Sequence, residues 1–177
     1  MRVIQNRTIH LLMIVFLCIA VPVTAGAGNK FKKEVQTEAS AVKLVREVQT
    51  GAYDVVTTTE LKQWIDSKKE MLIVDTMPYE GSYLKEHVPG AVQFLFPIKT
   101  MSAWDKTQTA GKNKDEYLKL LGPDKNKTIV VYCGFVKCTR SHNGAAWAKK
   151  LGYKNVYRYP GGIYHWKGAG FPVASGS

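Results

Sequence analysis

Cysteine is scarce in this sequence, with three residues among 177, and the scarcity narrows the chemistry that thiols could support. Cys18 lies in an apolar run near the N-terminus, so that Cys133 and Cys138 alone remain for the rest of the chain. The four histidines and these two cysteines do not have the spacing of metal ligands. We therefore expect no metal site and no cofactor.

Long apolar runs are also rare, and the one at the N-terminus predicts a signal peptide over residues 1–25. Arg2 and Arg7 precede the run "IHLLMIVFLCIAVPV", and the small-residue stretches "VTA" and "AGA" follow it as cleavage sites. An uncleaved membrane anchor is the alternative, but the run is short for a span of about 20 residues. We expect a secreted or periplasmic protein with no stable membrane insertion after cleavage.

Acidic residues are few, 14 against 25 lysines and arginines, which gives a formal net charge of +11. Loss of Arg2 and Arg7 with the signal peptide would leave +9. No basic run alternates with aromatic residues in a recognisable motif, so we expect no nucleic-acid partner. The positive charge is interpreted as favouring solubility and attracting small anions.

The sequence has no internal repeat and no low-complexity segment, and its pattern predicts one domain over 53–175. Residues 26–52 form a polar extension with a loose helical stripe, which serves either as a helix packed on the domain or as a spacer. Beyond it, short apolar strands alternate with helices, which predicts an α/β fold with a mostly parallel sheet. The predicted strands are 53–57, 71–76, 127–133 and 154–159, and 87–96 contains a Pro-Gly turn followed by another strand. The predicted helices include 59–69, 114–122 and 140–152, and 160–173 is a glycine-rich closing segment.

Cys133 ends a predicted buried strand and precedes a loop and a helix, the position where parallel sheets bind ligands. The free N–H groups and dipole of the helix N-terminus favour anions, so we expect a lowered pKa for this thiol. Lys137 and Arg140 add positive charge nearby, and a thiolate could then attack without a histidine base. Two plainer alternatives stay open: Cys133 is a small buried hydrophobe, or it forms an inert disulfide with Cys138.

Other polar residues near this edge of the sheet allow more than one role. Asp75 ends another buried strand and is either a catalytic acid or an acceptor of hydrogen bonds from loop N–H groups. Arg140 is either part of the site or a solvated charge at the helix start. His142 and His165 are interpreted as packing or surface residues.

The motifs of residues 53–173 resemble those of the rhodanese-like sulfurtransferases. "MLIVDTMPYEGSYLKEHVPGAV" is similar to the family's first signature, and "TIVVYC", "RSHNGAAWAKKLGYKNV" and "PGGIYHWKGAGFPV" follow in the family's order. The resemblance implies a three-layer fold in which helices flank the sheet. It also implies an enzyme in which a cysteine thiolate takes sulfane sulfur from thiosulfate, a persulfide or a polysulfide as a cysteine persulfide.

The resemblance also implies roles for individual residues and partners. Cys133 would be the nucleophile, Arg140 the loop arginine, and Ser141 the cap of the following helix, while Asp75 and His87 would support the site. The donor would be a small sulfur-containing anion, and the acceptor a thiol, sulfite, cyanide or a protein thiol. The remaining loop residues would bind the substrate oxyanion: Gly134, Phe135, Val136, Lys137 and Thr139.

Three features depart from the family pattern. The spacing from Cys133 to Arg140 is C-x6-R, two residues longer than the usual C-x4-R, and Met77 stands where the family has an arginine. The longer loop carries Cys138, which we interpret as a resolving thiol that attacks a Cys133 persulfide. Two alternatives to sulfur transfer remain: a thiol-disulfide or anion reductase that uses both cysteines, and a sulfur carrier or binding module. The loop length disfavours a phosphatase.

Overall fold

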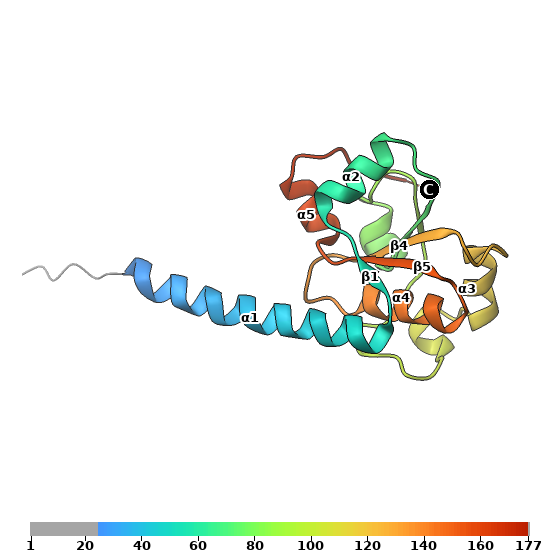
Figure 1. Ribbon diagram of the computed structural model, residues 1–177, viewed down its shortest axis with the longest axis horizontal. Coiled ribbons are helices and arrows are strands. Elements are labelled where there is room, and N and C mark those ends of the chain that lie inside the picture. Colours follow the sequence, from blue (N-terminus) through green and yellow to red (C-terminus); the bar gives the residue numbers. More distant parts are fainter. Residues whose placement is uncertain (1–24, 177) are drawn as a thin grey trace, which may run out of the picture.

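Five parallel strands form the central sheet of residues 25–176, the part of the chain that the computed structural model describes (Figure 1). The spatial order β1-β5-β4-β2-β3 places β4 in the middle, between β5 and β2. The strands are β1 (Asp54–Val55), β2 (Leu72–Asp75), β3 (Ala91–Gln93), β4 (Thr128–Tyr132) and β5 (Asn155–Tyr159). The predicted signal peptide lies outside the described residues, except for Ala25.

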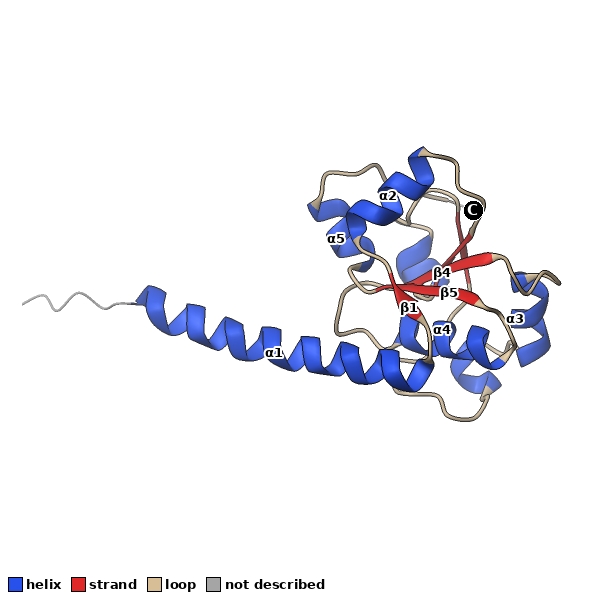
Figure 2. Cartoon of the chain, in the orientation of Figure 1, coloured by secondary structure: helices blue, strands red, loops and turns tan. Residues whose placement is uncertain are grey.

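Helices cover both faces of the sheet, which confirms the predicted α/β architecture with three layers (Figure 2). One face packs against α3 and α4, together with the end of α1, and the other packs against α2 and α5. The α-helices are α1 (Ala25–Gly51), α2 (Thr58–Asp66), α3 (Lys114–Leu121), α4 (Arg140–Lys150) and α5 (Gly162–Gly168). Two short turns of other helix types are η1 (Tyr79–Tyr83) and η2 (Lys106–Thr109).

Strand β4 is buried on both sides, which explains its continuous apolar sequence. Successive side chains of a strand point to opposite faces. Ile129 and Val131 accordingly pack toward α3 and α4, whereas Val130 and Tyr132 pack toward α2 and α5. The strand predicted after the Pro-Gly turn of 87–96 is β3, which is short because its partner β2 ends at Asp75, opposite Gln93.

The polar extension is the long helix α1, and its C-terminal part docks on the domain beside α4 (Figure 1). Val48 packs against the core, and Glu47 is buried. The N-terminal part projects away from the sheet, where Phe31 and Val35 are exposed. The structure thus favours the docked helix over the spacer for the last turns of α1.

Helix α5 was not predicted, because its glycine-rich sequence resembles a loop. It begins at Gly162, whose positive φ of 61° is a conformation that favours glycine. The N–H groups of Ile163 and Tyr164 donate hydrogen bonds of 3.0 Å to the carbonyls of Cys133 and Gly134. The start of α5 thereby fixes the backbone that directly follows β4.

We expect Gly162→Ala to lower the free energy of unfolding by about 2–4 kcal/mol. An added Cβ would lie 2.2 Å from the carbonyl oxygen of Cys133, and the positive φ would be strained. Urea unfolding followed by tryptophan fluorescence measures the change. Gly168→Ala is the matched control in the same helix, because no atom lies within 4 Å of its added Cβ. Equal effects of the two substitutions would contradict the close approach at Gly162.

Candidate functional site

The two cysteines lie together at the carboxyl end of β4, the edge of the sheet where the sequence placed the site. Cys133 directly follows β4, and Cys138 ends the loop that leads into α4. Both thiols are free and buried, with 1% of Cys133 and 9% of Cys138 exposed. In this structure Cys133 and Cys138 therefore form no disulfide with each other.

Cys133 occupies an environment that opposes ionisation. Its sulfur lies 3.4 Å from the carbonyl oxygen of Cys138 and 3.2 Å from the hydroxyl of Ser141. Burial raises the pKa of the Cys133 thiol well above its ordinary value, and the hydrogen bond and charge of Cys138 raise it further. The hydroxyl and the N–H of Ser141, in the first turn of α4, oppose this shift, but burial outweighs them, so that the pKa of Cys133 is raised where the sequence pattern predicts a lowered one.

Cys138 receives hydrogen bonds from Cys133, from the loop and from the first turn of α4. The Cys133 thiol donates to the sulfur of Cys138, and the backbone N–H groups of Arg140 and Gly134 also contact it. These three donors and the charge of Arg140 lower the pKa of Cys138 to about 6, against the opposing effect of burial. The N–H of Arg140 belongs to the first turn of α4, so that the helix terminus stabilises this thiolate.

We expect the rate of alkylation of Cys138 by iodoacetamide to rise with pH around a midpoint near 6. The thiolate is the reactive form, and at pH 7 about nine tenths of Cys138 would be ionised, so that the rate would be close to its maximum. Quantitative mass spectrometry of the alkylated peptides between pH 4 and pH 9 measures the midpoint. A midpoint above pH 8 would contradict the assignment, as would earlier ionisation of Cys133.

The remaining predicted loop residues lie around this pair in different ways. Lys137 is exposed, Val136 is half-buried, and Phe135 is 41% exposed with its ring 5.5 Å from that of Tyr164. The guanidinium of Arg140 donates to the carbonyl of Phe96, while its backbone N–H faces Cys138. Arg140 thus contacts the site through its backbone and its charge.

Ser141 is not the cap of α4, which corrects the role that the family resemblance implied. The helix begins at Arg140, and Thr139 precedes it without a capping hydrogen bond from its side chain. The hydroxyl of Ser141 instead accepts a hydrogen bond of 2.9 Å from Nε of Arg158 and lies against the sulfur of Cys133. Ser141 therefore connects Cys133 to a buried cation.

Arg158 and Glu47 belong to the site, and the sequence analysis missed both. Arg158 on β5 is fully buried, and its Nη1 lies 2.5 Å from Oε2 of Glu47 on α1. Arg158 and Lys43 hold the pKa of Glu47 below its ordinary value, although burial alone would raise it. Strand alternation could have predicted the burial of Arg158, because Arg158 lies on the same face of β5 as the core residue Val156. A buried arginine then requires an acidic partner.

Asp75 and His87 lie beside the site without contacting the cysteine loop through a described hydrogen bond. Oδ1 of Asp75 accepts a hydrogen bond of 2.8 Å from the N–H of Met77, the loop-holding role that the sequence left open. His87 stacks on the ring of Tyr83 at 4.1 Å, and its backbone pairs with Ala174. Both residues shape the loops of this edge.

We expect the free energy of unfolding of the wild type to fall between pH 4 and pH 7 because Asp75 ionises. We expect this contribution to be absent in Asp75→Asn. Burial raises the pKa of Asp75 from 3.8 to about 6. A carboxyl with a raised pKa costs stability as pH rises between these values, here about 3 kcal/mol. Urea unfolding of both proteins at pH 4 and pH 7 measures the difference. Parallel pH dependence in the two proteins would contradict the raised pKa.

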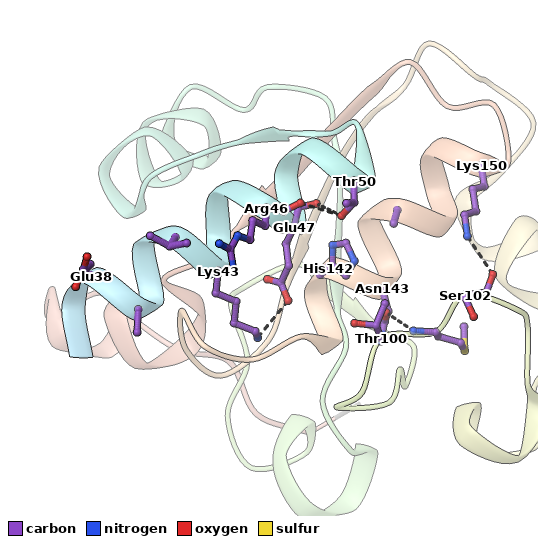
Figure 3. A pocket seen from close by; sticks show the side chains of 14 residues that line it. Glu38, Lys43, Arg46, Glu47, Thr50, Thr100, Ser102, His142, Asn143 and Lys150 are labelled. Atoms are coloured by element: carbon purple, nitrogen blue, oxygen red, sulfur yellow. Dashed lines mark hydrogen bonds and ion pairs between the residues drawn. The ribbon is translucent and has the colours of Figure 1, made fainter. Parts of the chain in front are cut away.

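Two clefts flank α1, and one of them borders the cysteine loop. That cleft, of about 670 Å³, lies between α1 and the residues Phe135, Val136, Lys137 and His165. A larger cleft of about 800 Å³ lies between α1 and α4, where Lys43, Arg46 and His142 line it (Figure 3).

In residues 25–176 no three side chains of His, Cys, Asp or Glu lie close enough together to bind a metal ion.

The comparisons with known proteins agree with this architecture. The chain is 28% identical over 137 residues to the Arabidopsis thaliana rhodanese-like domain-containing protein 14, chloroplastic, and covers 61% of that protein's length and 63% of its own. The structure is similar to a thiosulfate sulfurtransferase from Pseudomonas aeruginosa, with a TM-score of 0.58 and 19% identity over 78% of this chain and 23% of the other. It is also similar to the BH2092 protein from Bacillus halodurans, with a TM-score of 0.54 and 21% identity over 84% and 86% of the two chains.

At such low sequence identity, the similarity to these two structures shows a shared fold and nothing more. The family itself is shown by the sequence model of the rhodanese-like domain, which matches residues 57–169 and so includes both cysteines, Arg140 and Arg158. Residues before 57, including Glu47 and Lys43, lie outside that match. The chain belongs to the rhodanese-like domain family.

Proposed function

We propose that this protein is a sulfurtransferase that carries sulfane sulfur on its cysteine pair, with Cys138 as the first nucleophile. The observation that supports the proposal is the contrast between the two thiols. The hydrogen bond from the Cys133 thiol and those from the N–H groups of Arg140 and Gly134 lower the pKa of Cys138 to about 6, whereas burial raises the pKa of Cys133 well above its ordinary value. This assignment exchanges the roles that the sequence pattern gave to the two residues.

The first step forms a persulfide on Cys138. The Cys138 thiolate attacks the outer sulfur of thiosulfate, a sulfur–sulfur bond forms, and the bond inside thiosulfate breaks to release sulfite with its electron pair. One negative charge on the thiolate and two on thiosulfate become one on the persulfide and two on sulfite, so the total charge is conserved. The N–H groups of Gly134 and Arg140 would stabilise the negative persulfide, as they stabilise the thiolate. A persulfide or polysulfide donor would react in the same way and release a thiol or a shorter polysulfide.

The second step passes the outer sulfur to an acceptor. An acceptor thiolate attacks the outer sulfur of the protonated persulfide, and the Cys138 thiolate leaves, so that the acceptor becomes a persulfide. A cleft lined by Phe135, Val136 and Lys137 lies beside the cysteine loop and could receive the acceptor. Sulfite or cyanide would accept the sulfur in the same way.

Cys133 would act as the second thiol when no acceptor is present. The Cys133 thiol gives its proton to the outer sulfur of the Cys138 persulfide anion and attacks the inner sulfur, so that hydrosulfide leaves and a Cys133–Cys138 disulfide remains. The sulfane sulfur is thereby reduced while the two thiols are oxidised, and an external thiol must reduce the disulfide before the next cycle. The contact between the two thiols supports this branch.

A rapid-mixing experiment with thiosulfate tests the proposed function. In Cys133→Ser, which cannot form the disulfide, one equivalent of sulfite per protein chain should appear in a burst before any acceptor is added, together with a stable gain of one sulfur atom on the protein. Cyanide or a thiol added afterwards should remove that sulfur. A protein that neither releases sulfite nor gains sulfur from thiosulfate, a polysulfide or glutathione persulfide would refute the proposal.

We propose further that the protein is exported and acts outside the cytoplasm. The n-region, apolar run and small-residue cleavage sites of residues 1–25 support this proposal. N-terminal sequencing of the protein expressed in a Gram-negative host tests it. The expected mature chain begins near residue 26, and a chain that retains residues 1–25 in the cytoplasmic fraction would contradict export.

A further inference from the structure

We propose that Glu47 and Arg158 are positioning residues for the cysteine loop, so that α1 completes the site from outside the rhodanese-like segment. The inference deepens the proposed function and rests on it, since it concerns how the same thiol pair is held. It is carried by hydrogen bonds between α1, β5 and the loop.

Arg158 donates hydrogen bonds to the backbone of the cysteine loop. Its Nη2 donates to the carbonyl oxygens of Cys138 at 2.9 Å and Val136 at 3.2 Å. Its Nε donates to the hydroxyl of Ser141, which then has its own hydrogen free for the sulfur of Cys133. One buried guanidinium thus fixes the backbone of one cysteine and the hydroxyl that faces the other.

Glu47 orients this guanidinium and also grips the loop directly. Oε2 of Glu47 lies 2.5 Å from Nη1 of Arg158, and Oε1 accepts a hydrogen bond of 3.0 Å from the hydroxyl of Thr139. A planar guanidinium has fixed donor directions, so a carboxylate on one edge determines where the other donors point. Glu47 and Arg158 therefore act as one unit across 111 residues of sequence.

Lys43 adds a second link from the same face of α1. Its Nζ lies 2.6 Å from the carbonyl of Lys137 and 2.6 Å from the hydroxyl of Thr139. It also lies 3.1 Å from Oε1 of Glu47, and Figure 3 shows the two side chains pointing toward one another along the helix. Three consecutive loop residues, Lys137 to Thr139, are thus held by α1 or by the arginine that α1 orients.

The consequence concerns the acidity of Cys138. The sulfur of Cys138 meets the N–H of Arg140 only while the backbone from Cys138 into α4 keeps its present direction, and Arg158 fixes the carbonyl at the start of that segment. Loss of the network would let the loop rotate away from the helix terminus and would raise the pKa of Cys138. The charged and titratable groups that face this network are Lys43, Glu47, Tyr53, Cys133, Arg140, His142 and Arg158.

The test compares Glu47→Gln with Glu38→Gln in the full chain by the pH profile of Cys138 alkylation. Glu38 lies on the same helix, is exposed and contacts no loop residue through a described hydrogen bond. We expect the midpoint of Glu47→Gln to rise by at least about one pH unit and that of Glu38→Gln to match the wild type. A wild-type midpoint in a folded Glu47→Gln protein would overturn the proposal.

A second variant separates positioning from stability. The double substitution Glu47→Leu with Arg158→Met removes both charges and leaves no buried ion without a partner, so we expect it to fold. Circular dichroism checks the fold, and the Cys138 midpoint should rise as in Glu47→Gln. A folded double variant with a wild-type midpoint would show that the pair serves structure alone and would refute the proposal.

The failure of this inference and that of the proposed function have different signatures. A wild type that transfers no sulfur, but whose Cys138 midpoint rises in Glu47→Gln, would refute sulfur transfer and leave the positioning role standing. A wild type that transfers sulfur, with equal midpoints in all variants, would refute the positioning role alone.

Discussion

Replacing Cys138 with serine is expected to lower the rate of sulfur transfer from thiosulfate at least about 1000-fold. A serine hydroxyl is not ionised at neutral pH, whereas the hydrogen bonds from Cys133, Gly134 and Arg140 keep the Cys138 thiol largely ionised. The measurement is the rate of thiocyanate formation from thiosulfate and cyanide at pH 7.

Cys133→Ser is the matched control, with the same change of atom five residues earlier. We expect it to retain sulfur transfer within about tenfold, because Cys133 is protonated and does not take up the sulfur first. It should lose the ability to form the Cys133–Cys138 disulfide. Full transfer by Cys138→Ser, together with none by Cys133→Ser, would reverse the assignment of the two thiols.

Glu47→Ala is expected to lower the free energy of unfolding by about 3–5 kcal/mol. The substitution leaves the guanidinium of Arg158 buried, with none of it exposed and no carboxylate beside it. A buried charge that loses its partner costs far more than an exposed one. Urea unfolding followed by tryptophan fluorescence measures the loss.

Asp66→Ala supplies the control for the loss of an ion pair. Lys62 and Asp66 form a pair on the surface of α2, where 59% of the Asp66 side chain is exposed. Exposed pairs contribute little, so we expect a change within about 0.5 kcal/mol. Equal losses in the two variants would show that burial does not set the energy of the Glu47–Arg158 pair.

The sheet was predictable because apolar strands and turn residues follow simple local rules. The runs that became β2 and β4 are nearly continuous in apolar residues and are bounded by polar or glycine-rich loops. The position of Cys133 directly after β4 followed from the same pattern. Helix α5 was missed because Gly161 and Gly162 indicate a loop, while burial of Ile163 and Trp166 against the sheet stabilises a helix there.

The contacts between distant segments could not be read from local patterns. The pair of Glu47 and Arg158 joins α1 to β5, and no periodicity relates their positions. The acidity of Cys138 depends on which sulfur the N–H of Arg140 reaches, and this depends on the path of the loop between Cys133 and Arg140. The sequence therefore placed Cys133 at the end of a buried strand, but it could not show how the loop brings Cys138 to the N–H of Arg140.

The location of the first sulfur is the most direct test of this account. Trypsin cleaves after Lys137, so the two cysteines fall on separate peptides, 128–137 and 138–140. Protein mixed with one equivalent of thiosulfate at pH 6.5, trapped at once with an alkylating reagent and digested, should carry the additional sulfur on peptide 138–140. Sulfur found first on peptide 128–137 would contradict the assignment of Cys138 as the nucleophile.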